Sequence, residues 1–166
     1  LMNVLELLNK GSDELKKKNI ATYRLDSEIL LSKVLRKKRE EILINLDQKI
    51  CLKNIYKYNN LIQRRSQNEP VAYITKEKEF WSKNFFVSKN TLIPRPETEL
   101  MVEKLVKIYK GKSISILDIG TGSGCILISL LSELSYSSGV GIDISKNAIL
   151  IAKKNAERHK KLLNTK

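Results

Sequence analysis

The chain of 166 residues carries 31 Lys and Arg against 18 Asp and Glu, which gives a formal net charge of +13. A hydrophobic fraction of 42% is ordinary for a globular protein, and no apolar run reaches the roughly 18 residues that a membrane span needs. The two cysteines, Cys51 and Cys125, offer no disulfide framework and no cluster of metal ligands. We therefore expect no metal, no membrane segment and a reducing, cytoplasmic setting. The positive charge favours encounter with nucleic acid or a ribonucleoprotein, or else reflects codon usage.

Residues 1–69 predict a small helical bundle, because apolar residues recur at helical spacing in four successive segments. The first segment holds Gly11, which weakens the middle of a helix. Thr22 is suited to cap the second helix, and the third is short. The fourth begins at about Leu52 and ends before Pro70, since the residue before a proline disfavours helical backbone.

After Pro70 the pattern changes to that of a hairpin. Residues 79–82 and 84–87 are rich in aromatic side chains and flank a short polar turn. We assign 70–95 as a hairpin linker. Pro96 then suits the first turn of a new helix, where its missing N–H leaves no hydrogen bond unmade.

Residues 96–166 predict the start of a doubly wound parallel sheet. A strand, a glycine loop, a helix, a strand and a helix follow one another in the segments 113–119, 120–124, 125–134, 139–144 and 145–160. Such a βαβα order is typical of α/β folds that bind a nucleotide or nucleoside at the carboxyl ends of their strands.

The loop carries glycines at Gly120, Gly122 and Gly124. Glycine permits positive φ and lets the backbone approach a ligand without a Cβ clash. Amide groups at the start of the following helix are suited to face that ligand. Asp143 stands at the end of the second predicted strand, where a carboxylate can accept both ribose hydroxyls of an adenosine.

Two positions favour one nucleoside over another. A dinucleotide fingerprint has Gly or Ala five residues after its first glycine, and this chain has Cys125 there. Asp118 precedes the loop, and its carboxylate would repel a pyrophosphate but tolerate the sulfonium and ammonium of S-adenosylmethionine. The pattern therefore predicts an S-adenosylmethionine site. A nicotinamide oxidoreductase and a tight turn without a ligand remain as alternatives.

Beyond this loop, several segments closely resemble the HemK/PrmC family of protein-(glutamine-N5) methyltransferases, and the likeness runs from about residue 4 to residue 160. The segments that carry it are 24–31, 64–65, 69–75, 79–81 and 92–99. Lys76 and Ser82 depart from it, because the family usually has glycine at both positions. The resemblance implies an N-terminal helical bundle, a β-hairpin linker and the first βαβα unit of a Rossmann-like class I methyltransferase sheet.

The same resemblance implies a function and a set of contacts. The family methylates a glutamine side-chain amide of peptide-chain release factors, with a helical domain that helps to grip the protein substrate, and a setting at the ribosome accords with the net charge. Its cofactor contacts carry over onto Gly120, Thr121, Gly122, Ser123, Gly124 and Asp143. It also places Arg95, Glu97 and Thr98 beside the cofactor. The alternative for those three is a helix cap and a surface ion pair.

One departure concerns catalysis. The family binds the substrate amide with an Asn-Pro-Pro-Tyr motif, and the prolines of this chain, Pro70, Pro94 and Pro96, are not adjacent to one another. Such a motif holds a poorly nucleophilic amide nitrogen in line with the methyl group. We therefore assign no catalytic residue and expect no turnover by this chain alone. We interpret it as a piece of a longer gene product or as an engineered fragment. In such a piece, strand 113–119 would expose an apolar edge, because the strand that normally pairs with it would be missing.

Two other functions stay open. Relatives with an Asn-Pro-Pro-Tyr motif also methylate adenine or cytosine amino groups, so DNA or RNA is an alternative substrate. A non-catalytic fragment that binds the cofactor or a partner is the third reading. The helical bundle and the segment 94–99 favour the protein substrate.

Overall fold

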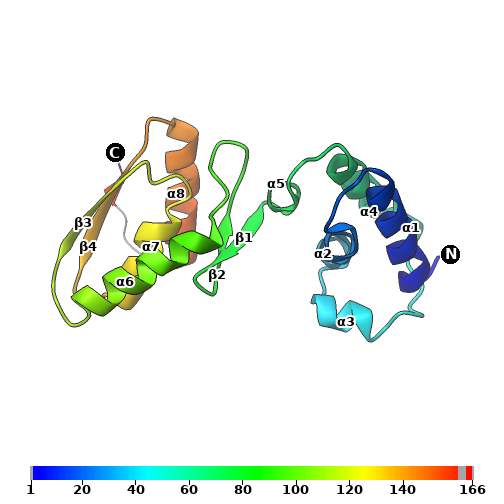
Figure 1. The fold of residues 1–166 in the computed structure, drawn as a ribbon, viewed down its shortest axis with the longest axis horizontal. Coiled ribbons are helices and arrows are strands. Elements are labelled where there is room, and N and C mark those ends of the chain that lie inside the picture. Colours follow the sequence, from blue (N-terminus) through cyan, green and yellow to red (C-terminus); the bar gives the residue numbers. More distant parts are fainter. Residues whose placement is uncertain (1, 161–163, 166) are drawn as a thin grey trace. The chain divides into compact units, whose positions relative to one another are not determined.

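A computed structural model describes residues 2–160 and 164–165, and its elements follow one another as drawn in Figure 1. The chain divides into two compact units, Leu1–Thr75 and Lys76–Lys166. The first unit extends beyond the boundary expected after residue 69, because the short helix α5 (Val71–Thr75) continues it.

The first unit is helical. Besides α5 it contains α1 (Val4–Lys17), α2 (Tyr23–Leu35), α3 (Arg39–Leu43) and α4 (Leu52–Ser66). A capping box starts α1: the Asn3 side chain accepts from the Glu6 amide at 2.8 Å, and the Glu6 carboxylate accepts from the Asn3 amide at 2.8 Å. Thr22 stands at the N-cap of α2, but its hydroxyl donates to Asp26 instead of accepting from a helix amide.

Gly11 of α1 faces Tyr58 and Ile62 of α4. The buried hydroxyl of Tyr58 is 2.6 Å from Ser27 Oγ, which donates to the Leu8 carbonyl at 3.1 Å. A Cβ on Gly11 would lie 1.9 Å from the Tyr58 hydroxyl oxygen. The glycine that we expected to weaken the helix therefore makes room for a buried tyrosine.

The second unit begins with the hairpin of β1 (Glu77–Phe80) and β2 (Lys83–Phe86), which pair antiparallel. Its loop consists of Trp81 and Ser82, with φ of 51° and 52°. The predicted turn, between 82 and 84, was therefore misplaced toward the C-terminus. A two-residue loop with positive φ at both positions matches the twist of the strands, which explains the earlier turn.

Lys76 and Ser82, where the resembling family usually has glycine, both have positive φ, at 61° and 52°. A side chain with a Cβ is strained in this region by about 1–2 kcal/mol. Ser82→Gly is therefore expected to raise the free energy of unfolding by about 0.5–1 kcal/mol, after the entropy cost of glycine. Urea denaturation measures this change. Asn84→Gly, in the adjacent strand, is the matched control and should lower the free energy; equal losses for both variants would contradict the strain.

After the hairpin, a 3₁₀ turn (η1, Pro96–Thr98) leads into α6 (Glu99–Tyr109). The predicted βαβα unit is confirmed as β3 (Ser115–Ile119), α7 (Cys125–Glu133), β4 (Ser138–Ile142) and α8 (Lys146–Arg158). β3 and β4 are parallel and in register from Ser115↔Ser138 to Ile119↔Ile142. A short strand β5 (Asn164–Thr165) pairs with the other edge of β4.

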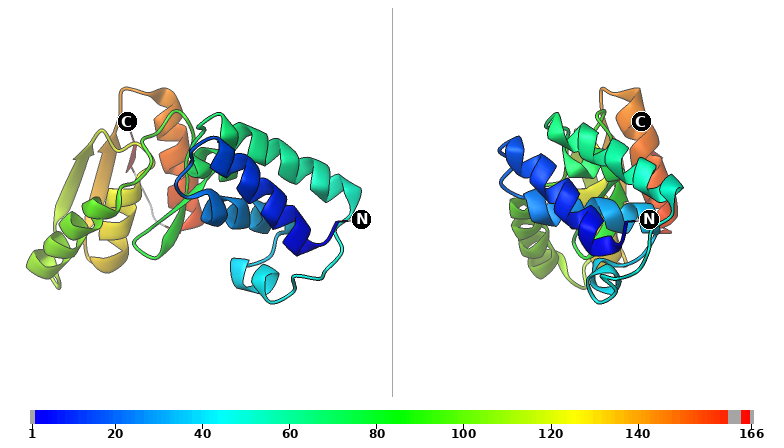
Figure 2. Two further views of the ribbon diagram at one scale, coloured as in Figure 1. Left: turned by 45° about the vertical axis from the view of Figure 1, so that its right-hand side comes forward. Right: turned by 90° about the vertical axis from the view of Figure 1, so that its right-hand side faces the viewer.

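Figures 1 and 2 show α6, α7 and α8 on one side of this sheet. The other face carries apolar side chains in solvent: Leu117 is 59% exposed, Ile119 75% and Ile144 105%. Within residues 2–160 and 164–165, β3 has a paired strand on one side only, which agrees with the expected open edge.

Among the residues that the structure describes, no helix is both long and apolar enough to cross a membrane. The same residues contain no group of three His, Cys, Asp or Glu side chains that could hold a metal ion.

Candidate functional site

The glycine loop between β3 and α7 closes over the end of β4. The amides of Gly120 and Thr121 both donate to the Ile142 carbonyl, at 2.8 and 2.9 Å. Gly120, Gly122 and Gly124 have φ of 79°, 54° and 77°, as the sequence predicted. Because residues with a Cβ rarely adopt such φ values, this backbone path requires its glycines.

Asp143 ties the loop to the start of α8. Its Oδ2 accepts from the Gly122 amide and its Oδ1 from the Ser145 amide, both at 2.9 Å. Ser145 then caps α8 by accepting from the Ala148 amide at 3.2 Å. A carboxylate has about four acceptor positions, so Asp143 retains room for ligand hydroxyl groups.

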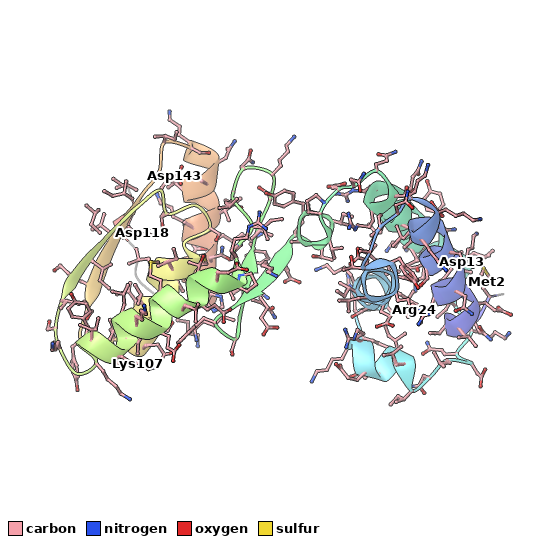
Figure 3. The ribbon with its side chains drawn as sticks, in the orientation of Figure 1. Met2, Asp13, Arg24, Lys107, Asp118 and Asp143 are labelled. Atoms are coloured by element: carbon pink, nitrogen blue, oxygen red, sulfur yellow. The ribbon has the colours of Figure 1, made fainter. Side chains whose placement is uncertain are left out.

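Asp118 lies at the same end of the β3–β4 pair as Asp143 (Figure 3). Thr121 Oγ1 donates to its Oδ2 at 2.8 Å. Burial raises the pKa of Asp118 above its ordinary value; the hydrogen bond from Thr121 opposes this rise, and the negative charge of Asp143 adds to it. A cationic group nearby would relieve both unfavourable effects, because it stabilises the ionised carboxylate.

The ends of β3 and β4 border an open cavity of about 380 Å³, lined by Ile119, Gly120, Ile142, Asp143 and Ile144. Of the six predicted contacts, Gly120 and Asp143 line it. The three isoleucines were not among the predicted residues. The signal that could have found them is their position: Ile119 and Ile142 end parallel strands, and Ile144 follows two residues after the second strand. Ligands bind at this edge of such sheets.

The other predicted contacts are not among the residues that line the cavity. Thr121, Ser123 and Gly124 are buried, and the Gly124 amide donates to the Thr121 carbonyl at 2.8 Å. The amides that we expected to face a ligand are thus largely used within the loop: those of Gly120, Thr121, Gly122 and Gly124 have protein acceptors. The Asp143 carboxylate is the polar side chain that faces this cavity.

Arg95, Glu97 and Thr98 belong to the segment around η1. Arg95 and Glu97 are exposed, and Thr98 is half-buried. Within the described part of the chain, no hydrogen bond or ion pair joins these three side chains to the glycine loop. Their position beside a cofactor stays a prediction. Pro96 occupies the first turn, as expected.

The second unit of the chain indicates the class of protein. Residues 110–164 match the family model described as "Methyltransferase domain". The match spans β3, the glycine loop, α7, β4 and α8, together with Asp143. The second unit is therefore a methyltransferase domain, which agrees with the α/β fold class predicted from the sequence.

The helical first unit indicates which family of methyltransferases the chain resembles. Residues 6–75 match the family model described as "PrmC N-terminal domain". The chain thus carries a PrmC N-terminal domain followed by a methyltransferase domain, and the resemblance to the HemK/PrmC family is confirmed.

Curated relatives point to the same family. The release factor glutamine methyltransferase of Leptospira interrogans is 44% identical over 157 residues, which are 93% of this chain and 54% of that protein. That of Buchnera aphidicola subsp. Acyrthosiphon pisum is 44% identical over 95% of this chain and 56% of its own. A bifunctional methyltransferase of Rickettsia typhi is 39% identical, over 95% and 34%. The chain spans about half the length of the first two relatives and about a third of the last.

Among solved structures, the tRNA (uracil-54, C5)-methyltransferase of Pyrococcus abyssi, in complex with S-adenosyl-L-homocysteine, aligns with 54% of this chain and 22% of its own. The identity is 20% and the TM-score 0.45.

Proposed function

We propose that this chain holds S-adenosylmethionine and belongs to an enzyme that methylates a glutamine side-chain amide of peptide-chain release factors. The observation that supports it most is the cavity at the ends of β3 and β4, with the glycine loop on one side and the Asp143 carboxylate on its wall. It occurs in a chain that is 44% identical to release factor glutamine methyltransferases over most of its length.

The residues around the cavity fit this cofactor chemically. Asp143 would accept the ribose hydroxyls, and Ile119, Ile142 and Ile144 offer apolar surface for a purine. Asp118, whose pKa is raised by burial, gains from a neighbouring cation. When bound, S-adenosylmethionine supplies an electrophilic methyl group on a sulfonium, so it is both an adenosine and a cation.

The choice of substrate depends on the first unit. A PrmC N-terminal domain over residues 6–75 favours a protein substrate over the alternative, an amino group in DNA or RNA. The net charge of +13 agrees with either, and with work in the cytoplasm near ribosomes. The protein substrate is therefore the better-supported proposal.

The test is a calorimetric titration of the folded chain. We expect saturable binding of S-adenosylmethionine and none of NAD, because the carboxylate of Asp118, which accepts a hydrogen bond from Thr121 of the loop, would repel a pyrophosphate bound there. Circular dichroism establishes that the chain is folded before each titration.

Two outcomes would contradict the proposal. Binding of NAD in preference to S-adenosylmethionine would refute the reading of the glycine loop, and a folded chain that binds neither would refute the cofactor site. The substrate is tested in the full-length protein with labelled S-adenosylmethionine: methyl transfer to DNA or RNA but not to a release factor would favour the alternative.

A further inference from the structure

Asn155, in the last turn of α8, is a polar side chain with no exposed surface. Its Oδ1 accepts from the Phe86 amide at 2.7 Å. Its Nδ2 donates to the Phe86 carbonyl at 3.0 Å and to the Ser123 carbonyl at 2.8 Å. Both amide hydrogens and the amide oxygen are therefore used, although nothing in the site described above accounts for this residue.

The two groups that Asn155 joins belong to distant parts of the sequence. Phe86 ends β2 of the hairpin, and Ser123 belongs to the glycine loop, next to Gly124 with φ of 77°. Asp143 holds the loop at the Gly122 amide, and Asn155 holds it at the Ser123 carbonyl. The loop is thus fixed at successive residues from β4 and from α8.

The chemistry of the contact requires a carboxamide. The backbone N–H and C=O of Phe86 point to one side, as they would toward a neighbouring strand. The side-chain amide of Asn155 forms a hydrogen bond with each of them, and its second N–H donates to the Ser123 carbonyl. A leucine of similar shape would leave the buried Ser123 carbonyl and the partly buried amide and carbonyl of Phe86 without this partner. A fully buried group left in this way costs about 1–3 kcal/mol.

Other contacts attach the hairpin to α8 without reaching the loop. Arg158 Nη1 lies 3.1 Å from Glu77 Oε1, and His159 Nε2 lies 3.0 Å from the Asn84 carbonyl. At the turn of the hairpin, the Trp81 amide donates to Glu99 on α6. Asn155 differs from these contacts because one side chain touches both the hairpin and the loop.

We propose that Asn155 is a positioning residue that fixes the glycine loop for the cofactor and couples it to the β1–β2 hairpin. The cofactor part of this inference rests on the proposed function. Ligand-induced tightening of the loop would strengthen the Asn155–Ser123 hydrogen bond and thereby restrain Phe86. Coupling of this kind is reciprocal, so breaking the hydrogen bonds between Asn155 and Phe86 would weaken binding of the cofactor.

The experiment compares Asn155→Leu with Arg158→Gln in the full chain. The control removes a hairpin–α8 ion pair but no contact to the loop. Without ligand, hydrogen exchange at the Gly124 amide, which donates to Thr121, should accelerate in Asn155→Leu and not in Arg158→Gln. With S-adenosylmethionine, Asn155→Leu should bind about tenfold or more weakly, as the loss of a buried hydrogen bond implies.

A second readout tests the coupling itself. S-adenosylmethionine should slow exchange of the Phe86 amide in the parent and in Arg158→Gln, but not in Asn155→Leu. If Asn155→Leu does not fold, Asn155→Ser takes its place, since serine also lacks the carboxamide but is smaller than asparagine.

The outcomes separate the two proposals. Equal cofactor affinity and equal Gly124 exchange in parent and Asn155 variant would overturn the positioning role. Equal losses in Asn155→Leu and Arg158→Gln would also overturn it, because hairpin attachment alone would then explain them. A parent that binds no S-adenosylmethionine would refute the proposed function instead, while ligand-free exchange at Gly124 still decides whether Asn155 fixes the loop.

Discussion

Asp143→Ala is expected to weaken binding of S-adenosylmethionine by about 100-fold or more. The substitution removes the acceptor for the ribose hydroxyls and also frees the Gly122 amide from its 2.9 Å hydrogen bond. Hydrogen bonds to a charged acceptor contribute about 1.5–3 kcal/mol each, and a loss of about 3 kcal/mol corresponds to about 100-fold. Isothermal titration of the parent and the variant measures this change.

Two further variants separate the roles of the carboxylate. Asp143→Asn keeps one acceptor oxygen, but its NH₂ group must face either the Gly122 or the Ser145 amide, so we expect an intermediate loss. Asp47→Ala removes an exposed carboxylate in the helical unit and should leave the affinity unchanged. The titrations are run at a temperature well below the midpoint of thermal unfolding, because loss of the hydrogen bond from Ser145 in the Asp143 variants also destabilises the start of α8. A loss of less than threefold in Asp143→Ala would be incompatible with ribose binding at this carboxylate.

The features around the cavity that the sequence predicted and the structure shows are the glycine conformations and the position of Asp143, and both are local. Positive φ at Gly120, Gly122 and Gly124 follows from the residue type and from the strand–loop–helix order. Asp143 was found in the same way, since the residue after a parallel strand lies at the ligand-binding edge of the sheet. Both inferences need only a few neighbouring residues and the alternation of strands and helices.

The parts that it did not predict depend on contacts between distant residues. The hairpin turns at Trp81, whose amide donates to Glu99 and whose indole N–H donates to Glu133, both at 2.9 Å. Those partners are 18 and 52 residues away, so no local pattern reveals them. The apolar lining of the cavity was also not predicted. Ile144 is apolar and fully exposed, whereas apolar periodicity predicts which residues are buried.

Asn155 shows the same limit within a helix. It stands between the buried residues Ala152 and Ala156, on the inner face of α8. A polar residue at such a position signals a buried hydrogen-bonding role. The sequence does not say which backbone groups it meets, because Phe86 and Ser123 are 69 and 32 residues away.

Gly11→Ala is expected to lower the free energy of unfolding by about 2 kcal/mol. By helix propensity alone, the change in the middle of α1 should stabilise the protein by about 1 kcal/mol. The new Cβ, however, would lie 1.9 Å from the hydroxyl oxygen of Tyr58 and 2.7 Å from its Cζ. Tyr58 has no exposed surface and bonds to Ser27, so it cannot swing away without disturbing the core. Overpacking costs about 1–3 kcal/mol, and so close an approach lies at the upper end, which leaves a net loss of about 2 kcal/mol after the gain in propensity. Chemical denaturation measures this net loss.

Tyr58→Phe shows whether the hydroxyl is the cause of that loss. As a single substitution, Tyr58→Phe removes the hydrogen bond to Ser27 and should lower the free energy of unfolding by about 1 kcal/mol. Ser27 keeps its hydrogen bond to the Leu8 carbonyl. In the Tyr58→Phe background, Gly11→Ala should cost less than in the parent, because the nearest atom is gone. The rescue should be partial, since Cζ at 2.7 Å is still too close. An equal cost of Gly11→Ala in both backgrounds would mean that the hydroxyl contact does not select glycine here, and that α1 and α4 separate as whole helices to admit the new methyl group.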